Sequence, residues 1–308
     1  MFSVVFPGQG SQVVGMGKSF YDKYELVKKY FKEADEALNL PLSKIILDGP
    51  KTDLDLTFNT QPAIFLISYS IFNVVKKEFN IDLNKANFFA GHSLGEYSAL
   101  ACAGYIKFSD TIKILKTRGE AMQNAVPKGI GGMLAILGAE IEKIENILKD
   151  NKDNFNIQIA NDNSDGQIVV SGKLECLDKF VEILKSMGIK NIKLPVSAPF
   201  HCELMSNATK IMHDHIHKIN FSKGNNVLMS NVTADKISEI SEIQNLLIKQ
   251  IESRVRWRES VVKMISDGVE NFIEIGPGKV LSGLIKRIDK KVKVQSVNNE
   301  EDIKNLII

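Results

Sequence analysis

The segment Asn87-Phe88-Phe89-Ala90-Gly91-His92-Ser93-Leu94-Gly95-Glu96 decides the fold, because it joins a short apolar run to Gly-x-Ser-x-Gly and then to a helical pattern. This order is typical of a nucleophile elbow, in which a serine occupies a sharp turn between a strand and a helix. Gly91 and Gly95 stand two residues on either side of the serine, where a side chain would keep the two backbones apart. The segment predicts a buried strand, an elbow at Ser93 and a following helix.

The same residues also fit a simpler interpretation. Ser93-Leu94-Gly95-Glu96 has the spacing of a helix capping box, in which the serine would only cap the helix. The preceding strand favours the elbow, which places the serine at a helix N-terminus where unpaired N–H groups stabilise negative charge. We therefore predict that Ser93 is a nucleophile and keep the helix cap as the alternative.

Short apolar runs alternate with longer segments of helical period on both sides of the elbow, which predicts an α/β fold with a mainly parallel sheet. These runs are residues 4–6, 88–90, 227–229, 272–275 and 292–297. The middle of the chain differs, since it reads as strand, helix, strand, a turn at residues 163–166, strand, helix and strand, the ferredoxin-like order βαββαβ. We expect a hydrolase-like catalytic domain made of residues 1–128 and 198–308, with a ferredoxin-like subdomain, residues 129–197, inserted in it.

The composition is that of an ordinary globular protein. The 308 residues are 44% hydrophobic and 25% charged, which excludes disordered and collagen-like chains. The 39 Lys and Arg residues nearly balance the 37 Asp and Glu residues, so no nucleic-acid partner is expected. The most apolar stretch, residues 63–75, is too short and too polar for a membrane span and predicts a buried helix. The opening residues 1–10 read as a first strand and not as a signal peptide.

Cysteines and clustered histidines give no sign of a metal site. Three widely spaced cysteines without a CxxC pair favour neither a disulfide framework nor a zinc site, and predict a reducing, cytoplasmic location. His213, His215 and His217 lack an HExxH context, so we interpret them as a solvated helix surface. No metal and no cofactor are predicted.

A serine nucleophile needs a base, and His201 is the best placed of the five histidines. It follows an extended stretch that leaves the predicted insert, whereas His92 is next to the serine and is expected to point away. The glycine-rich turn after the first strand fits neither the dinucleotide nor the Walker pattern. Its N–H groups could complete an oxyanion hole with the N–H of Leu94, or the glycines could serve only the turn.

Arg118 follows the elbow helix on a second helical segment. Arginines on helices most often form surface ion pairs. If Arg118 instead faces the serine, its planar fork would bind a carboxylate, and the substrate would be a dicarboxylic half-ester or half-thioester.

Taken together, these segments resemble the malonyl-CoA:acyl carrier protein transacylase family over almost the whole chain. The matching segments are Phe6-Pro7-Gly8-Gln9-Gly10-Ser11-Gln12, Thr60-Gln61-Pro62-Ala63, Gly91-His92-Ser93-Leu94-Gly95-Glu96, Arg118-Gly119, Ala160-Asn161-Asp162-Asn163-Ser164-Asp165-Gly166-Gln167, Pro199-Phe200-His201, Gln250 before a segment ending at Trp257, and Glu274-Ile275-Gly276-Pro277-Gly278. Their ordered agreement is more specific than any one motif.

The resemblance implies a role for each matching site residue. Ser93 would be acylated, with His201 as its base, and the malonyl carboxylate would be held by Arg118. The resemblance implies further that Gln9 and Leu94 supply the oxyanion N–H groups, that the backbone carbonyl of Gln250 orients the histidine, and that Gln250, Phe200, Gln61, Asn161 and Asn163 belong to the substrate site.

The resemblance also implies the partners: malonyl-CoA as donor and an acidic acyl carrier protein as acceptor, docked on basic residues near the site, in fatty-acid or polyketide synthesis. No membrane partner is implied, and a monomer is expected. Phe200 departs from the serine of many bacterial members, and a ring there should exclude an α-methyl group and favour unbranched malonyl. Asp165 replaces a usual proline, with little expected consequence because aspartate also forms turns.

Two alternatives remain open on the sequence. An α/β-hydrolase thioesterase or esterase shares the elbow but places its histidine late in the chain, and here no histidine follows His217. A non-catalytic protein that binds acyl carrier protein would keep the fold without the reaction.

Overall fold

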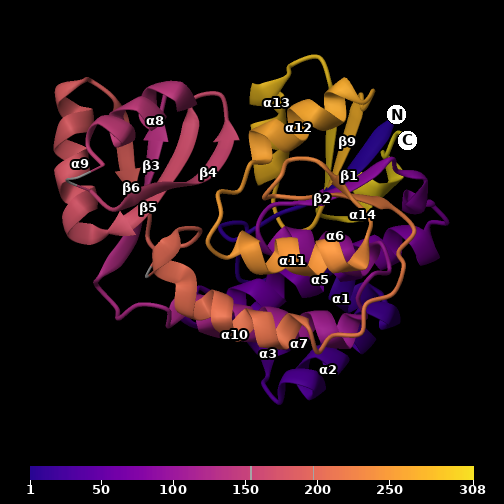
Figure 1. Ribbon diagram of the computed structural model, residues 1–308. Helices are drawn as coiled ribbons and strands as arrows, with labels where there is room; N and C mark the ends of the chain where they lie inside the picture. The colour runs from indigo at the N-terminus through magenta and orange to yellow at the C-terminus, as the bar shows by residue number, and fades with distance from the viewer. Residues whose placement is uncertain (153–154, 197) are drawn as a thin grey trace.

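The structure is a computed structural model that describes residues 1–152, 155–196 and 198–308. These residues form a six-stranded and a four-stranded sheet, which lie beside one another with separate helices (Figure 1). The larger sheet has the order β10-β9-β1-β2-β7-β8, and all neighbours are parallel except the β7–β8 pair. Its strands are β1 (Phe2–Phe6), β2 (Phe88–Gly91), β7 (Val227–Met229), β8 (Lys236–Ile237), β9 (Asn271–Ile275) and β10 (Lys293–Val297).

Helices cover both faces of this sheet because successive side chains of a strand point to opposite faces. Val4 and Phe6 belong to the core formed with α5 (Thr57–Glu78) and α6 (Leu94–Cys102). Val5 belongs to a second core with α12 (Trp257–Ser266) and α13 (Val280–Ile288). The predicted buried helix over residues 63–75 is confirmed as the central part of α5. The carboxyl ends of β1, β2 and β7 meet at one edge of the sheet, where ligands of such folds bind.

The remaining helices complete these layers and the insert. They are α1 (Lys18–Lys23), α2 (Glu25–Leu38), α3 (Leu42–Asp48), α4 (Lys51–Leu54), α7 (Phe108–Gln123), α8 (Ile141–Asp150), α9 (Leu174–Ser186), α10 (Ser206–Ile216), α11 (Ile240–Gln250) and α14 (Glu300–Lys304), with 3₁₀ turns at Leu83–Lys85 and Glu203–Met205.

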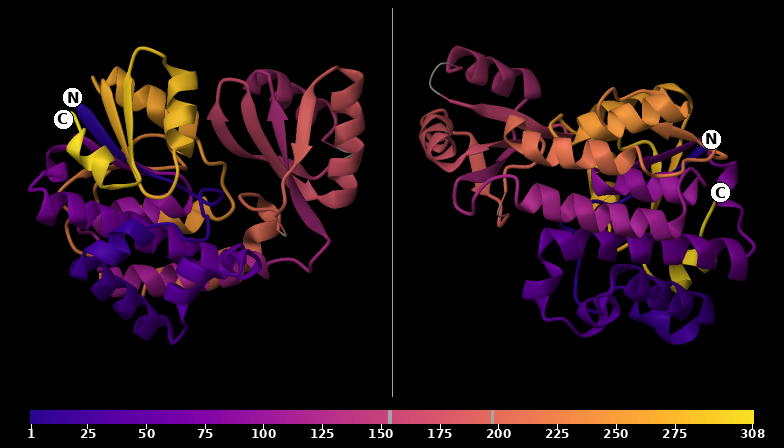
Figure 2. Two further views of the ribbon diagram at one scale, coloured as in Figure 1. Left: turned by 180° about the vertical axis from the view of Figure 1, so that it is seen from behind. Right: turned by 60° about the horizontal axis from the view of Figure 1, so that its bottom comes forward.

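The smaller sheet is antiparallel, with the order β4-β5-β3-β6. Its strands are β3 (Gly131–Leu137), β4 (Ile157–Ser164), β5 (Gln167–Lys173) and β6 (Lys190–Lys193). The chain order β3, α8, β4, β5, α9, β6 confirms the ferredoxin-like insert, which projects from the larger part in both views of Figure 2. Leu134 and Ile136 face the helices of the insert, whereas Met133 and Ala135 join the main core.

The predicted turn at residues 163–166 is wrong at its start. Asn163 and Ser164 belong to β4, and only Asp165 and Gly166 turn, because β4 keeps pairing with β5 as far as Ser164 opposite Gln167. The register of the pair skips Ala160 and Asn163, as at a β-bulge, and the strand continues beyond each of them. The predicted last residue of the insert, residue 197, lies outside the described residues. The domain boundaries at 129 and 197 stay a prediction.

Candidate active site

The elbow forms where β2 runs into α6, and it depends on its two glycines. Ser93 has φ 54° and ψ −109°, a conformation that non-glycine residues rarely adopt. A Cβ on Gly91 would lie 1.9 Å from the carbonyl of Gly95, and a Cβ on Gly95 would lie 2.2 Å from the backbone oxygen of Phe6. The chain can therefore turn this sharply only with glycine at both positions.

Ser93 does not act as a helix cap. It occupies the N-cap position of α6, but its side chain accepts no hydrogen bond from that helix. Its Oγ instead lies 2.8 Å from Nε2 of His201. The capping-box interpretation is therefore wrong, and the predicted pairing of serine and histidine is present.

His201 is held in one tautomer by the backbone. Its Nδ1 lies 2.8 Å from the carbonyl oxygen of Gln250, which can only accept, so Nδ1 carries the proton and Nε2 is free to accept one from Ser93. Burial and, secondarily, the nearby charge of Arg118 lower the pKa of His201 to about 3. The imidazole is therefore neutral at physiological pH, as a general base must be.

Arg118 is buried at the site and is not a surface residue, since its exposure is 1%. Its Nη1 donates to Oε1 of Gln61 at 2.8 Å, and its Nη2 donates to Oε1 of Gln250 at 2.8 Å and to Ser93 Oγ at 3.1 Å. Among the ion pairs of the described residues none includes Arg118. A buried cation held by neutral amides beside the serine is suited to bind an anionic substrate group.

A cavity of about 110 Å³ opens over these groups. It is lined by Gln9, Gln61, His92, Ser93, Leu94, Arg118, Met122, Met133, Asn161, Leu194, Val196, Phe200 and His201. Its size suits a small acyl group and excludes a whole coenzyme. Eight of the ten predicted site residues line it, whereas Gln250 lies behind Arg118 and Asn163 contacts His92, with 2.8 Å between Oδ1 and Nε2.

Two backbone N–H groups at this cavity are available to an oxyanion. Within the described residues, neither the N–H of Gln9 nor that of Leu94 has an acceptor. Leu94 begins α6, so its N–H belongs to the unpaired first turn of a helix.

Contrary to expectation, His92 lines the cavity too, although its ring contacts Asn163 and not the serine.

Two residues of the site were missed by the sequence analysis. Asn231, just after β7, accepts from the Ser93 N–H and donates to the Gly91 carbonyl, both at 2.7 Å, and so braces the elbow. Glu96 is 2% exposed and accepts from Nε2 of Gln250 at 2.5 Å. Burial raises the pKa of Glu96 to about 7. The position of Asn231 at the carboxyl end of a parallel strand was the available signal, whereas Glu96 gave none beyond its capping-box spacing.

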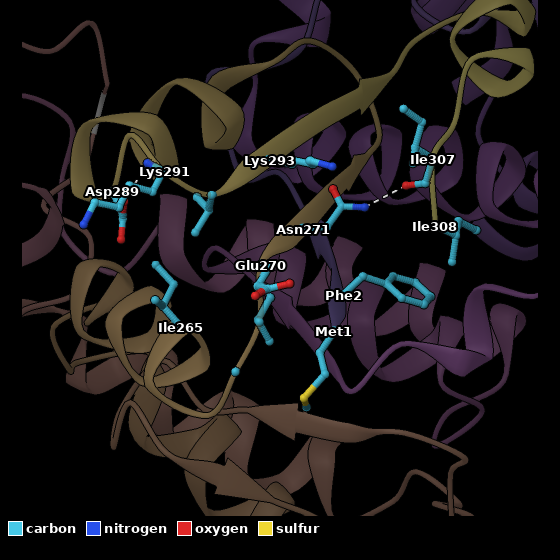
Figure 3. Close-up of a pocket in the computed structure, with 13 residues that line it drawn as sticks. Met1, Phe2, Ile265, Glu270, Asn271, Asp289, Lys291, Lys293, Ile307 and Ile308 are labelled. Atoms are coloured by element: carbon cyan, nitrogen blue, oxygen red, sulfur yellow. Dashed lines mark hydrogen bonds between the residues drawn. The ribbon is translucent and has the colours of Figure 1, made fainter.

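Other candidate sites lack comparable chemistry. No group of metal ligands occurs in the described parts of the chain, and His213 is 58% exposed on its side chain, as a solvated helix surface requires. A cavity of about 650 Å³ lies at the amino ends of β1, β9 and β10 (Figure 3). There Asn271 donates to the carbonyl of Ile307 at 2.7 Å, a contact that ties residue 307 to the sheet. None of the helices over residues 1–152, 155–196 and 198–308 has the length and hydropathy of a membrane span.

Comparison with known proteins identifies the family of the chain. Residues 3–303 match the family described as acyl transferase domain. The chain is 42% identical over 301 residues to the malonyl CoA-acyl carrier protein transacylase of Bacillus subtilis, which covers 97% of this chain and 94% of the relative. It is 37% identical to the protein of that name from Escherichia coli K12, with 96% of each chain covered.

Solved structures agree with the sequence relatives. The acyl-carrier-protein-S-malonyltransferase of Bartonella henselae superimposes with a TM-score of 0.95 at 40% identity, covering 98% of this chain and 97% of that one. The malonyl CoA-acyl carrier protein transacylase of Clostridium perfringens gives a TM-score of 0.93 at 41% identity, with 98% and 95% covered. On the fold, the elbow and these similarities, the chain belongs to the malonyl CoA-acyl carrier protein transacylase family of acyl transferase domains.

Proposed function

We propose that this chain transfers a malonyl group from malonyl-CoA to the phosphopantetheine thiol of acyl carrier protein in fatty-acid biosynthesis. The observation that carries the proposal is that Ser93 Oγ lies within hydrogen-bond distance of both His201 Nε2 and Arg118 Nη2 in one small cavity. The first contact supports a nucleophile and its base. The second supports a substrate whose acyl group ends in a carboxylate.

The first half of the reaction makes a malonyl-serine ester. His201 Nε2 takes the hydroxyl proton as Ser93 Oγ attacks the thioester carbonyl. The N–H groups of Gln9 and Leu94 stabilise the tetrahedral oxyanion. When the carbon–sulfur bond breaks, the proton on His201 passes to the leaving sulfur, and CoA departs as a thiol.

The second half repeats these steps with a new thiol. The phosphopantetheine thiol gives its proton to His201 and attacks the ester, and the serine oxygen takes that proton back as it leaves. The Gln250 carbonyl, 2.8 Å from Nδ1, holds the ring and stabilises the imidazolium in both halves. No aspartate is needed because a thiol leaving group requires less acid assistance than an amine.

Acyl selection follows from the walls of the cavity. Arg118 is proposed to bind the free carboxylate, and Gln61 holds that guanidinium in place. Phe200 lines the cavity and narrows it against an α-methyl group, which supports unbranched malonyl. Asn161 lines the cavity directly, whereas Asn163 would act on the substrate only through His92.

The acceptor is supported by a similar protein. A malonyl-transacylase solved in complex with a type II polyketide acyl carrier protein has a TM-score of 0.94 and 36% identity to this chain. Residues 129–197 as a separate insert, a cytoplasmic location, a monomeric state and the absence of a cofactor stay predictions.

Intact-mass measurement after mixing with malonyl-CoA tests the proposal. We expect a malonyl adduct on the wild-type chain and none on Ser93→Ala. The adduct should disappear when acyl carrier protein is added, with malonyl transferred to it. Rapid release of free malonate without an acceptor would instead support a thioesterase, and a folded wild-type chain without any adduct would support a non-catalytic binding protein.

A further inference from the structure

We propose that Glu96 is a positioning residue for acyl selection, because its carboxylate sets which end of the Gln250 side-chain amide faces Arg118. Glu96 does not line the cavity, so its effect on a substrate has to pass through its neighbours. The inference rests on the proposed function, since a malonyl group is the acyl group that would use Arg118.

The amide of Gln250 lies between groups of fixed polarity. Its Nε2 donates to Oε2 of Glu96 at 2.5 Å and to the carbonyl of Ser93 at 3.0 Å. Its Oε1 accepts from Nη2 of Arg118 at 2.8 Å. A carbonyl can only accept and a guanidinium can only donate. Oε2 of Glu96 faces the N–H of Asn231 as well as Nε2 of Gln250 and therefore acts as an acceptor here, so a single orientation of the amide satisfies all three groups.

The reversed amide would break these contacts. It would turn Oε1 toward the oxygens of Glu96 and Ser93, and it would turn the N–H groups of Gln250 toward the guanidinium of Arg118. Gln250 is fully buried, so water does not replace the lost partners. Nε2 has a third, longer contact of 3.4 Å to Oδ1 of Asn231, a side chain that also braces the elbow. Glu96 makes the shortest of the three contacts, and its side chain is therefore the one to change.

Glu96 also reaches the elbow by a second route. Its Oε2 lies 3.4 Å from the N–H of Asn231, whose side chain in turn accepts from the Ser93 N–H. A purely structural role for Glu96 would act on the elbow and would slow every acyl donor alike. A positioning role acts through Arg118 and therefore distinguishes malonyl from acetyl.

The test compares Ser93 acylation by malonyl-CoA and by acetyl-CoA in full-length variants. Glu96→Leu removes the acceptor, and the ratio of kcat/KM for malonyl over acetyl is expected to fall about tenfold. Glu96→Asp withdraws the carboxylate by one methylene and should lower the ratio in the same direction even if the leucine variant does not fold. Glu96→Gln can still accept through Oε1 and should keep the ratio within about threefold of wild type.

Glu274 provides a matched control, because it is also a buried glutamate that accepts hydrogen bonds within the protein. Glu274 is fully buried and accepts from Leu281 and Ser282 at the start of α13. Glu274→Leu should lower stability and leave the malonyl-to-acetyl ratio unchanged, because Glu274 has no contact with Gln250 or Arg118.

Three results would overturn the inference while the proposed function stands. The first is an equal fall in kcat/KM for malonyl-CoA and acetyl-CoA in both Glu96→Leu and Glu96→Asp. The second is a fall in the malonyl-to-acetyl ratio in Glu96→Gln as large as that in Glu96→Leu. The third is a fall in kcat/KM for malonyl-CoA that Glu96→Leu causes to the same extent when Arg118 is already alanine. A wild-type chain that forms no malonyl adduct would overturn the proposed function, and this inference with it.

Discussion

Replacing Arg118 with alanine should remove most of the preference for malonyl over acetyl. The guanidinium is 1% exposed and is held at 2.8 Å by the amides of both Gln61 and Gln250, so its position is set before the substrate arrives. Without it, a malonyl carboxylate in a cavity of about 110 Å³ would be buried with no cationic partner. Losing one partner of a buried charge pair costs about 2 to 5 kcal/mol. At about 1.4 kcal/mol per factor of ten, the loss is between about 30-fold and several thousand-fold.

The assay is the rate of CoA release on acylation of Ser93, followed with malonyl-CoA and with acetyl-CoA. We expect kcat/KM for malonyl to fall by at least about 30-fold while the value for acetyl stays within about threefold. Arg256→Ala is the control, since Arg256 is partly exposed and pairs with Glu259 at 2.6 Å, a contact worth less than about 1 kcal/mol. Equal losses for the two donors would refute the carboxylate-binding role of Arg118.

Three further changes test the base, the elbow and the buried carboxylate. His201→Ala should slow the appearance of the acyl-enzyme at least about 100-fold, and an unchanged rate would mean that another group is the base. Gly91→Ala should give little folded protein, because the new Cβ would lie 1.9 Å from the backbone of Gly95. Gly283→Ala is the control, since the new methyl group in helix α13 meets no atom within 4 Å. Alanine is the better helix former, so this control should raise the free energy of unfolding by about 0.5–1 kcal/mol in a urea titration. Burial raises the pKa of Glu96 from 4.5 to about 7, so between these pH values the folded state keeps a proton that the unfolded state loses. The free energy of unfolding should therefore fall by about 3 kcal/mol on account of this carboxyl as the pH rises from about 4.5 to about 7. The Glu96→Gln variant should lack that decline. The free energy of unfolding of the wild-type chain and of Glu96→Gln is measured in urea at pH 5 and at pH 8. A difference between the two proteins that is the same at both pH values would disprove the reasoning.

Features that depend on neighbouring residues could be predicted from the sequence. The elbow follows from an apolar strand, two glycines and a serine within ten residues, and the insert follows from its alternation of strands and helices. The start of the turn at residues 163–166 could not be found in this way, because Asn163 and Ser164 have turn-forming side chains. They stay extended because β4 continues past an irregularity at Asn163 and pairs Ser164 with Gln167 of β5.

The roles of single polar side chains were harder to predict because they depend on distant partners. Arg118 on its own looks like a surface residue of an amphipathic helix, and its burial follows from contacts with Gln61 and Gln250, which are 57 and 132 residues away. The resemblance to a known family supplied that assignment. Neither the local pattern nor the resemblance indicated that Glu96 turns inward to Gln250.

The insert is joined to the rest of the chain by more than its two connecting segments. The N–H of Val255 donates to the carbonyl of Ala160 at 2.8 Å, the N–H of Asp162 donates to the carbonyl of Val255 at 3.0 Å, and Arg258 pairs with the Asp162 carboxylate at 3.0 Å. Swinging the insert outward would have to break all of these at once. These contacts oppose a widening of the cavity above the serine. The width of the cavity can be changed by exchanging side chains of its wall such as the ring of Phe200, which makes none of these three contacts.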